Sequence, residues 1–205
     1  METIEVTRRD GIVTVLLNRP HKKNAMTPTM WEELIEVFAE VEASRDDRVL
    51  VITGAEDAFC SGADLTDASG SDSAATGVGA SVERMRLVNR CALTLHELHT
   101  PTLAAVNGVA AGAGLNLALG CDIVIASDRA RFSEIFSKRG LSVDFGGSWL
   151  LPRLVGLHRA KELVLLADII DATEAERIGL VNRVVPHAEF PSVVAALAAR
   201  LAALP

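Results

Sequence analysis

The sequence predicts an α/β protein whose strands are largely parallel. Short apolar runs rich in β-branched residues recur along the chain, and apolar residues at helical spacing fill the segments between them. Strands that alternate with helices in this way build a mainly parallel sheet with helices packed on it. The chain has 205 residues, which is enough for one domain with a sizeable core.

Composition narrows the classes of function. Hydrophobic residues make up 49% of the chain, charged residues 23% and aromatic residues 4%, and the net charge is −7. Because such a chain offers neither a basic surface nor stacking platforms, we expect no nucleic-acid partner. No apolar run is long enough for a membrane segment, and the N-terminal residues form no signal peptide, which favours a cytoplasmic protein. The cysteines are expected to be reduced thiols rather than a metal site: Cys60, Cys91 and Cys121.

The N-terminal part is expected to begin with a β-hairpin. Apolar residues between positions 4 and 17 flank Asp10-Gly11, which is a strong turn signal. Thr27-Pro28 then opens a helix, because threonine is a good N-cap and proline suits the first turn. Apolar residues continue at helical spacing to Val41. Residues 49–53 form the next predicted strand.

The stretch 101–122 organises the middle of the chain. Thr102–Val106 is an apolar run that predicts a buried strand. Residues 110–114, AAGAG, carry almost no side chains, and they lead into a helix that Gly120 can cap. Small residues at such a junction let a ligand approach the first N–H groups of the helix, which have no partner within it. An earlier segment, residues 59–65 (FCSGADL), has the same design.

The remaining elements follow the same alternation. Residues 66–80 are rich in small and polar side chains and predict a mobile surface loop, which could be a lid over a site or a solvated insertion. Strands are expected at 121–126, 130–135 and 181–185, and helices at 82–98, 148–154, 158–166 and 192–204.

Three interpretations fit the second small-residue junction. A dinucleotide would need the pattern G-x-G-x-x-G, and Leu117 stands where the third glycine belongs. A thioester oxygen that becomes an enolate could be held there by backbone N–H groups, as in an oxyanion hole. Close packing of a helix on a strand, without any ligand, is the third interpretation.

Several motifs together resemble the enoyl-CoA hydratase/isomerase (crotonase) superfamily. They are N-R-P…N-A at residues 18–25, F-C-S-G-A-D-L at 59–65, V-N-G-V-A-A-G-A-G at 106–114, G-C-D-I-V-I-A at 120–126 and G-L-V-N-R-V-V at 179–185. The resemblance implies a crotonase-type spiral of repeated ββα units, with residues 1–190 as the core domain. Family members usually continue through several more C-terminal helices, so residues 191–205 are expected to be the incomplete start of that region. The resemblance also implies homotrimers or hexamers, an acyl-CoA thioester substrate, and no metal or redox cofactor beyond the coenzyme A of the substrate.

The resemblance implies a thioester site at the two junctions. By position, the backbone N–H groups of Ala63 and Ala113 form the oxyanion hole. The arm of the CoA thioester is lined from both junctions, by Ser61, Gly62, Asp64, Leu65 and Gly112. Asp64 and Asp122 also match residues that have structural roles. Lys23 matches a position whose basic side chain approaches the CoA phosphates or adenine, although a solvated surface lysine is the alternative.

The acid–base residues suggest the reaction. Asn116 and Phe136 stand where a typical hydratase carries two glutamates, and neither can accept a proton, which undermines two-carboxylate hydration. Asp144 matches the acid–base aspartate of the isomerases in the superfamily, and apolar neighbours would raise its pKa. Glu134 would point to the same side as Phe136 if both lie on one strand, but we expect a surface or ion-paired carboxylate there.

Four functions remain open on this evidence. The first is an acyl-CoA isomerase with Asp144 as the single proton shuttle. The second is an enoyl-CoA hydratase of fatty-acid β-oxidation with altered catalytic residues. The third is an aryl-CoA dehalogenase that uses Asp144 as a nucleophile, which would need a histidine base whose position His96 does not obviously match. The fourth is a non-catalytic subunit that binds acyl-CoA.

Overall fold

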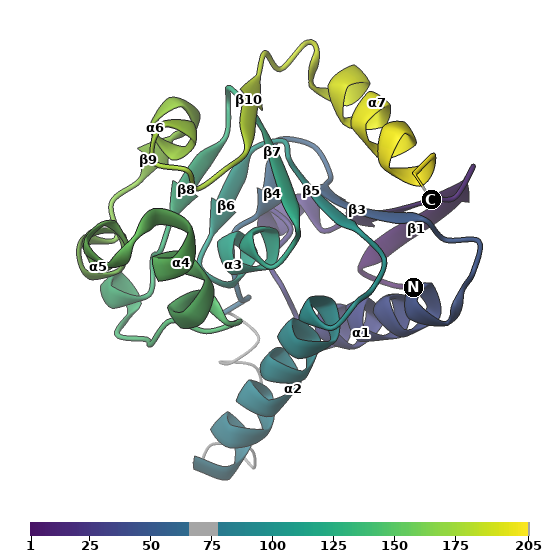
Figure 1. Ribbon diagram of the computed structural model, residues 1–205. Coiled ribbons are helices and arrows are strands. Elements are labelled where there is room, and N and C mark those ends of the chain that lie inside the picture. Colours follow the sequence, from purple (N-terminus) through teal and green to yellow (C-terminus); the bar gives the residue numbers. More distant parts are fainter. Residues whose placement is uncertain (66–77, 205) are drawn as a thin grey trace.

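Two β-sheets form the centre of the protein in the computed structural model, which describes residues 1–65 and 78–204. The larger sheet has the strand order β1-β2-β3-β5-β7-β10, and the smaller one the order β4-β6-β8-β9 (Figure 1). The larger sheet consists of β1 (Ile4–Arg9), β2 (Ile12–Leu17), β3 (Val49–Gly54), β5 (Thr102–Val106), β7 (Ile123–Ser127) and β10 (Arg183–Val185). The smaller sheet consists of β4 (Ala58–Cys60), β6 (Val109–Ala111), β8 (Arg131–Ser133) and β9 (Ile170–Asp171).

Seven α-helices and two 3-10 turns are described around the sheets. The helices are α1 (Pro28–Ala43), α2 (Val78–His96), α3 (Ala113–Leu119), α4 (Gly147–Val155), α5 (Leu157–Leu166), α6 (Ala172–Arg177) and α7 (Phe190–Ala202). The turns are η1 (Pro20–Lys22) and η3 (Ser137–Arg139). None of the helices in the described segments is both long and apolar enough to cross a membrane.

Most strand pairs are parallel, as the sequence predicts. The strands from β2 through β10 of the larger sheet pair in parallel, and so do β4, β6 and β8 of the smaller one. The two antiparallel pairs are β8 with β9 and the predicted hairpin of β1 with β2, which turns at Asp10-Gly11. Asp10 and Gly11 both have positive φ angles, of 53° and 77°, as a tight hairpin turn requires.

The chain advances through repeated ββα units. β3, β5 and β7 lie in the larger sheet, and each is followed by a strand of the smaller sheet (β4, β6 and β8) and then by helical structure. This repetition confirms the predicted α/β spiral. It also places the ends of β4, β6 and β8 side by side, since these strands are parallel neighbours.

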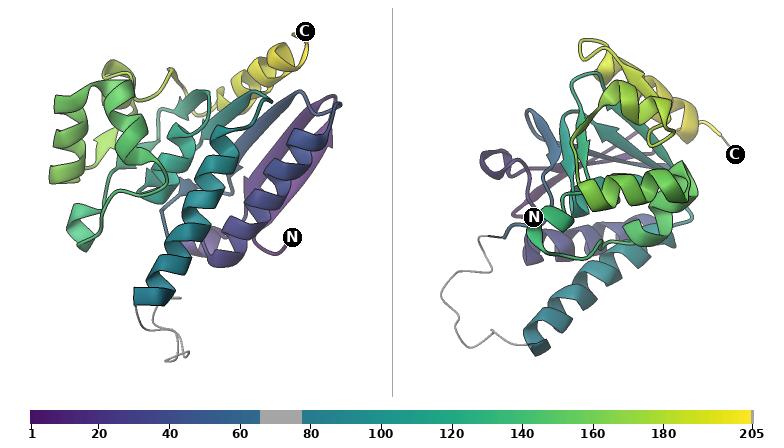
Figure 2. Two further views of the ribbon diagram at one scale, coloured as in Figure 1. Left: turned by 60° about the horizontal axis from the view of Figure 1, so that its bottom comes forward. Right: turned by 90° about the vertical axis from the view of Figure 1, so that its left-hand side faces the viewer.

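Both faces of the larger sheet are buried, but under different helices. Side chains alternate along each strand, so neighbouring residues enter different cores. Leu50, Ile52 and Ala104 belong to the main core with α1, whereas Val49, Val51 and Leu103 belong to a second core with α7. Figures 1 and 2 show α1 and α2 side by side, with α7 on the opposite side of the sheet.

Several element boundaries differ from the predicted ones. Helix α2 begins at Val78, four residues before the predicted start, and the rest of the predicted 66–80 loop lies outside the described residues. Strand β8 ends at Ser133 instead of residue 135, and α7 begins at Phe190. The N-cap of α1 agrees with the prediction, because the Thr27 side chain accepts a hydrogen bond of 3.2 Å from the Met30 N–H.

Candidate active site

The two small-residue junctions meet in the structure. They follow β4 and β6, whose parallel pairing places Cys60 opposite Ala110. A Cβ atom added to Gly62 would lie 2.9 Å from the Ala111 carbonyl oxygen and 3.8 Å from the Ala113 nitrogen. The φ angle of Gly62 is +99°, a conformation that side chains disfavour. Glycine at this position therefore allows the two backbones to approach closely.

The backbone hydrogen bonds around Ala63 leave its N–H group directed away from the neighbouring segment around Met26. Met26 donates to the Gly62 carbonyl and Asp64 donates to the Met26 carbonyl, each at 2.8 Å. In this parallel bridge the N–H of the residue between them, Ala63, points to the other side. Ala113 is the first residue of α3, where an N–H group has no partner within the helix.

The segment around Lys23 is fixed against the first junction. The Ser61 N–H donates to the Lys23 carbonyl at 3.0 Å, and the Ser61 hydroxyl donates to the Lys22 carbonyl at 3.2 Å. The buried Asn24 amide donates to the Ala58 carbonyl at 2.8 Å. Lys23 itself is exposed and has a φ angle of +50°, and its backbone contact with Ser61 places the residue at the rim of the junction.

Asp64 and Leu65 have different surroundings, although both were expected along the thioester arm. The Asp64 carboxylate pairs with the Arg19 guanidinium at 3.0 Å, and its side chain is only 3% exposed. Arg19 also donates to the Ala25 carbonyl at 2.6 Å, so this ion pair ties the 19–25 segment to the first junction. Leu65 is half exposed.

Asp144 lies beside α3, in a turn that a buried aromatic residue anchors. Its carbonyl oxygen accepts hydrogen bonds from the Asn116 amide at 3.1 Å and from the Gly147 N–H at 2.9 Å. Phe145 has a φ angle of +49° and stacks on Trp31 with a centroid distance of 5.3 Å. Burial raises the pKa of the Asp144 carboxyl to about 6, and its own backbone N–H opposes the shift. Asn116 is one helical turn from Ala113, so the structure brings Asp144 to the second junction.

The prediction that Glu134 is a surface or ion-paired carboxylate is wrong. Its residue is 1% exposed, and neither carboxyl oxygen has a hydrogen-bond partner in the described part of the chain. Burial and then the charge of Asp144 raise the pKa of Glu134 to about 8, while the neighbouring Asn116 amide, which does not reach hydrogen-bond geometry with the carboxyl, opposes the shift. Because β8 already ends at Ser133, Glu134 and Phe136 do not share a strand face. No sequence motif marks Glu134, and only its place in the fold identifies it.

Cys60 and Asp122 have the structural roles predicted for them. Cys60 is fully buried, and burial raises the pKa of its thiol to about 12, as expected for a packed cysteine. Asp122 accepts hydrogen bonds from the backbone N–H and the hydroxyl of Thr102, at 2.8 and 2.7 Å. Within the described residues, no three His, Cys, Asp or Glu side chains come together in a group that could hold a metal ion.

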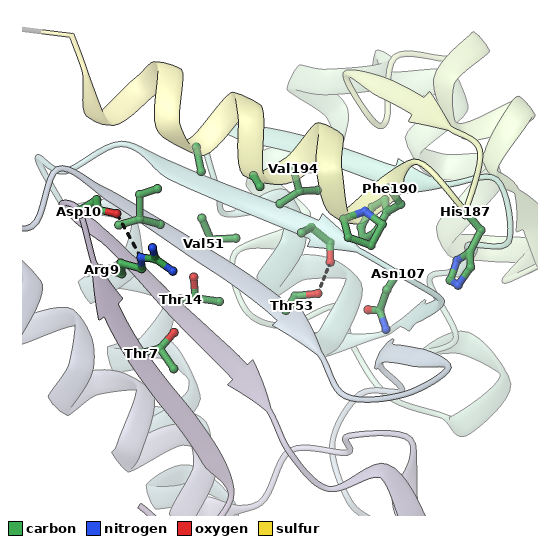
Figure 3. A pocket seen from close by; sticks show the side chains of 15 residues that line it. Thr7, Arg9, Asp10, Thr14, Val51, Thr53, Asn107, His187, Phe190 and Val194 are labelled. Atoms are coloured by element: carbon green, nitrogen blue, oxygen red, sulfur yellow. Dashed lines mark hydrogen bonds and ion pairs between the residues drawn. The ribbon is translucent and has the colours of Figure 1, made fainter.

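Two clefts lie near these elements. One of about 530 Å³ opens between the larger sheet and α7, with threonines of the sheet facing Phe190 and Val194 (Figure 3). It lies in the α7 core, on the face of the sheet away from α1, and does not include either junction. The other, of about 270 Å³, adjoins the Asp144 turn between α2 and α4. It is lined mainly by apolar and aromatic residues, including Leu93, His96, Phe145 and Trp149.

Comparisons with known proteins agree with this architecture. A family model described as enoyl-CoA hydratase/isomerase matches residues 7–205. The chain is 42% identical to the 1,2-epoxyphenylacetyl-CoA isomerase of Escherichia coli K12, covering 100% of this chain and 78% of that protein. It is 34% identical to 4-chlorobenzoyl coenzyme A dehalogenase-2 of an Arthrobacter species, covering 98% and 73%. The crystal structure of an enoyl-CoA hydratase from Bacillus anthracis matches with a TM-score of 0.92 and 31% identity, covering 98% and 77%. The chain therefore belongs to the enoyl-CoA hydratase/isomerase (crotonase) family.

Proposed function

We propose that the protein is an acyl-CoA isomerase that shifts a double bond, or rearranges a ring epoxide, through a thioester enolate. The observation that carries this proposal is the position of Asp144. Asp144 is a partly exposed residue whose carboxyl has a raised pKa, and its carbonyl oxygen accepts a hydrogen bond from Asn116, which is one helical turn from Ala113. A base whose pKa is close to the working pH suits proton transfer from and to carbon. Asn116 and Phe136 offer no carboxylate at the two positions that a typical hydratase uses.

The proposed mechanism uses the two junctions and one carboxylate. The N–H groups of Ala63 and Ala113 donate to the thioester oxygen and stabilise the negative charge that develops on it. The Asp144 carboxylate removes a proton from C2 of a 3-enoyl-CoA, and the electron pair moves through the thioester to give a dienolate. The resulting acid then returns the proton to C4, and the double bond settles between C2 and C3. No electron is gained or lost, so the reaction consumes no cofactor.

The CoA part of the substrate would lie along the first junction. We assign Ser61, Gly62 and Leu65, with Gly112 of the second junction, to the thioester arm. Lys23 stands exposed at the rim of the junction, where its charge could meet the CoA phosphates. Asp64 contributes indirectly, because its carboxylate is bound to Arg19. A homotrimer or hexamer and a cytoplasmic location remain predictions.

Hydration is the second candidate function, and one observation favours it. Glu134 supplies a second buried carboxyl near Asp144. The substitutions at positions 116 and 136 alone do not reveal this carboxyl. The Bacillus anthracis neighbour is an enoyl-CoA hydratase. A dehalogenase is less well supported, because the His96 ring packs edge to face against Trp149, with a centroid distance of 5.4 Å.

The test pairs two assays on the wild type and Asp144→Asn. One assay follows conversion of a 3-enoyl-CoA to the 2-enoyl-CoA, and the other follows hydration of crotonyl-CoA. We expect isomerisation in the wild type and a loss of about 10³-fold in kcat for Asp144→Asn. Asp168→Asn, which removes a carboxyl that is 70% exposed, should leave the rate unchanged. Hydration without isomerisation would favour the hydratase, and tight binding of CoA esters without turnover would favour the non-catalytic subunit.

A further inference from the structure

The buried polar atoms without a hydrogen-bond partner gather at one place in the described chain. They are Asn116 Oδ1, both carboxyl oxygens of Glu134, and Asp144 Oδ1. Buried polar groups are nearly always paired in folded proteins. Three neighbouring side chains that leave such atoms unpaired therefore indicate a site that handles protons or a ligand, rather than ordinary packing.

We propose that Glu134 and Asp144 form a carboxyl pair that holds one proton at neutral pH, with the proton on Glu134 and the charge on Asp144. The carboxyl pair itself does not depend on the proposed function, but its expected effect on turnover does. Glu134 is a positioning residue in this scheme, because it acts through Asp144 and is itself 1% exposed. Asp144 is the member of the pair that a substrate could reach, since it is only half buried.

The different burial of the two residues decides which one keeps the proton. Two neighbouring carboxyls in a buried site cannot both ionise without a large cost, so one of them remains protonated. Burial and the charge of Asp144 raise the pKa of Glu134 to about 8, whereas burial raises the pKa of Asp144 only to about 6. The more buried acid is therefore the neutral one between these values.

No described cation neutralises Glu134. Helix α3 and strand β6, which lie beside it, have the sequences AGLNLAL and VAA and carry no titratable side chain. The basic residues of the neighbouring elements have other partners or face solvent. Arg131 donates to the Ala130 carbonyl, Lys138 donates to the Ala167 carbonyl, Arg139 is exposed, Arg153 lies over the Trp149 ring, and Arg159 pairs with Glu162. Among the described residues, Asp144 is the charged group that raises the pKa of Glu134.

A fixed, neutral amide lies beside the pair. Asn116 is fully buried and its amide donates to the Asp144 carbonyl. A Cβ atom on Gly147 would lie 2.4 Å from the Asn116 amide atoms, so the turn after Asp144 closes directly over this side chain. Asn116 therefore lies next to both acidic residues, and a neutral side chain at this position avoids a third charge.

Carboxyl titration tests the pair without any need for turnover. Side-chain carboxyl ¹³C NMR of the protein, with Glu134→Gln and Asp144→Asn for assignment, should show Glu134 ionising after Asp144. In Glu134→Gln, Asp144 should titrate in a single step. In Asp144→Asn, the Glu134 pKa should fall, because the opposing charge is gone, but it should stay above its ordinary value owing to burial. The proposal would be overturned if the Glu134 carboxyl is ionised at pH 7, or if its pKa is the same in Asp144→Asn as in the wild type.

Turnover gives the second readout. Glutamine resembles a neutral carboxylic acid in shape, so Glu134→Gln should keep kcat within about threefold of the wild type at pH 7. A loss as large as that of Asp144→Asn would show that Glu134 itself must exchange a proton, and it would also overturn the proposal. If the wild type fails to isomerise any enoyl-CoA, the proposed function fails, while the NMR titration still decides the carboxyl pair.

Discussion

The two halves of the candidate site are built in opposite ways. The half formed by the two junctions consists of backbone, and its small residues allow two chain segments to approach within contact distance. The half around Asp144 consists of three side chains from separate elements, and four of their polar atoms are buried without a partner among the residues that the structure describes. The first half should therefore be sensitive to added bulk, and the second to added or removed charge.

After the loss expected for Asp144→Asn, the largest effect on turnover should come from adding one methyl group to the junction half. Gly62→Ala places a Cβ atom 2.9 Å from the Ala111 carbonyl oxygen at a φ angle of +99°. The backbone must shift to relieve this contact, and the Ala63 N–H would move with it. Because one oxyanion donor is worth about 10²- to 10³-fold in rate, we expect kcat for isomerisation to fall by about 10²-fold.

Gly156→Ala is the matched control for this variant. Gly156 has a φ angle of +77°, but no heavy atom of residues 1–65 and 78–204 outside its own neighbours lies within 4 Å of an added Cβ. It should lose about 1 kcal/mol of stability from backbone strain and keep its activity. Unchanged kcat in Gly62→Ala, or an equal loss in both variants, would contradict the role of the junction.

In the half of the site around Asp144, ionisation of Glu134 should change the free energy of unfolding with pH. The unfolded chain releases the Glu134 proton near its ordinary pKa of 4.5, whereas the folded chain keeps it until about pH 8. The unfolding free energy of the wild type should therefore fall as the pH rises through this range. Glu134→Gln removes that fall, so at pH 8.5 it should be more stable than the wild type by roughly 4 to 5 kcal/mol, since a difference of one pKa unit corresponds to about 1.4 kcal/mol.

Denaturant unfolding at several pH values measures this difference. Glu97→Gln, at an exposed position of the chain, controls for the loss of one carboxyl. Asp144 remains in both proteins and adds a smaller fall of the same sign between its ordinary value of 3.8 and about 6. Parallel curves for the wild type and Glu134→Gln would show that Glu134 is already ionised in the folded protein.

The same contrast explains what the sequence could predict. The two junctions could be predicted because the runs of small residues, SGAD and AAGAG, are local sequence patterns. In the structure, the parallel pairing of β4 with β6 brings the two junctions together. The hairpin at Asp10-Gly11 and the N-cap at Thr27 are equally local signals, and both are confirmed.

The carboxyl cluster could be predicted only in part. Asp144 stands in a motif, but Glu134 is a single acid after a strand whose length the sequence misjudges. β8 pairs with β9 only through Arg131 and Phe132, and it ends at Ser133. Period-two alternation does not extend past that residue, so the direction of the Glu134 side chain depends on tertiary contacts that no local pattern encodes.

The ion pair beneath the first junction should affect stability more than chemistry. Asp64→Asn removes the partner of Arg19, whose side chain is only 15% exposed. We expect a loss of about 2 kcal/mol in the free energy of unfolding, because a largely buried charge loses its partner. Asp10→Asn is the control, since the Arg9–Asp10 pair has side chains that are 91% and 82% exposed and should contribute almost nothing. Equal denaturation midpoints for the two variants would contradict this role of Asp64.

The smallest effect should come from the rim of the junction half. Lys23→Ala removes an exposed positive charge beside Ser61, where the proposed path of the CoA phosphates begins. We expect KM to rise about threefold with kcat unchanged, because an exposed ion pair contributes less than about 1 kcal/mol. The difference between the variant and the wild type should shrink at high salt, which screens exposed charges. Lys161→Ala, at an exposed position on α5, is the control. A change in KM that does not depend on salt, or a change in kcat, would contradict a charge contact with the ligand. It would show instead that Lys23 acts by supporting the backbone of the junction.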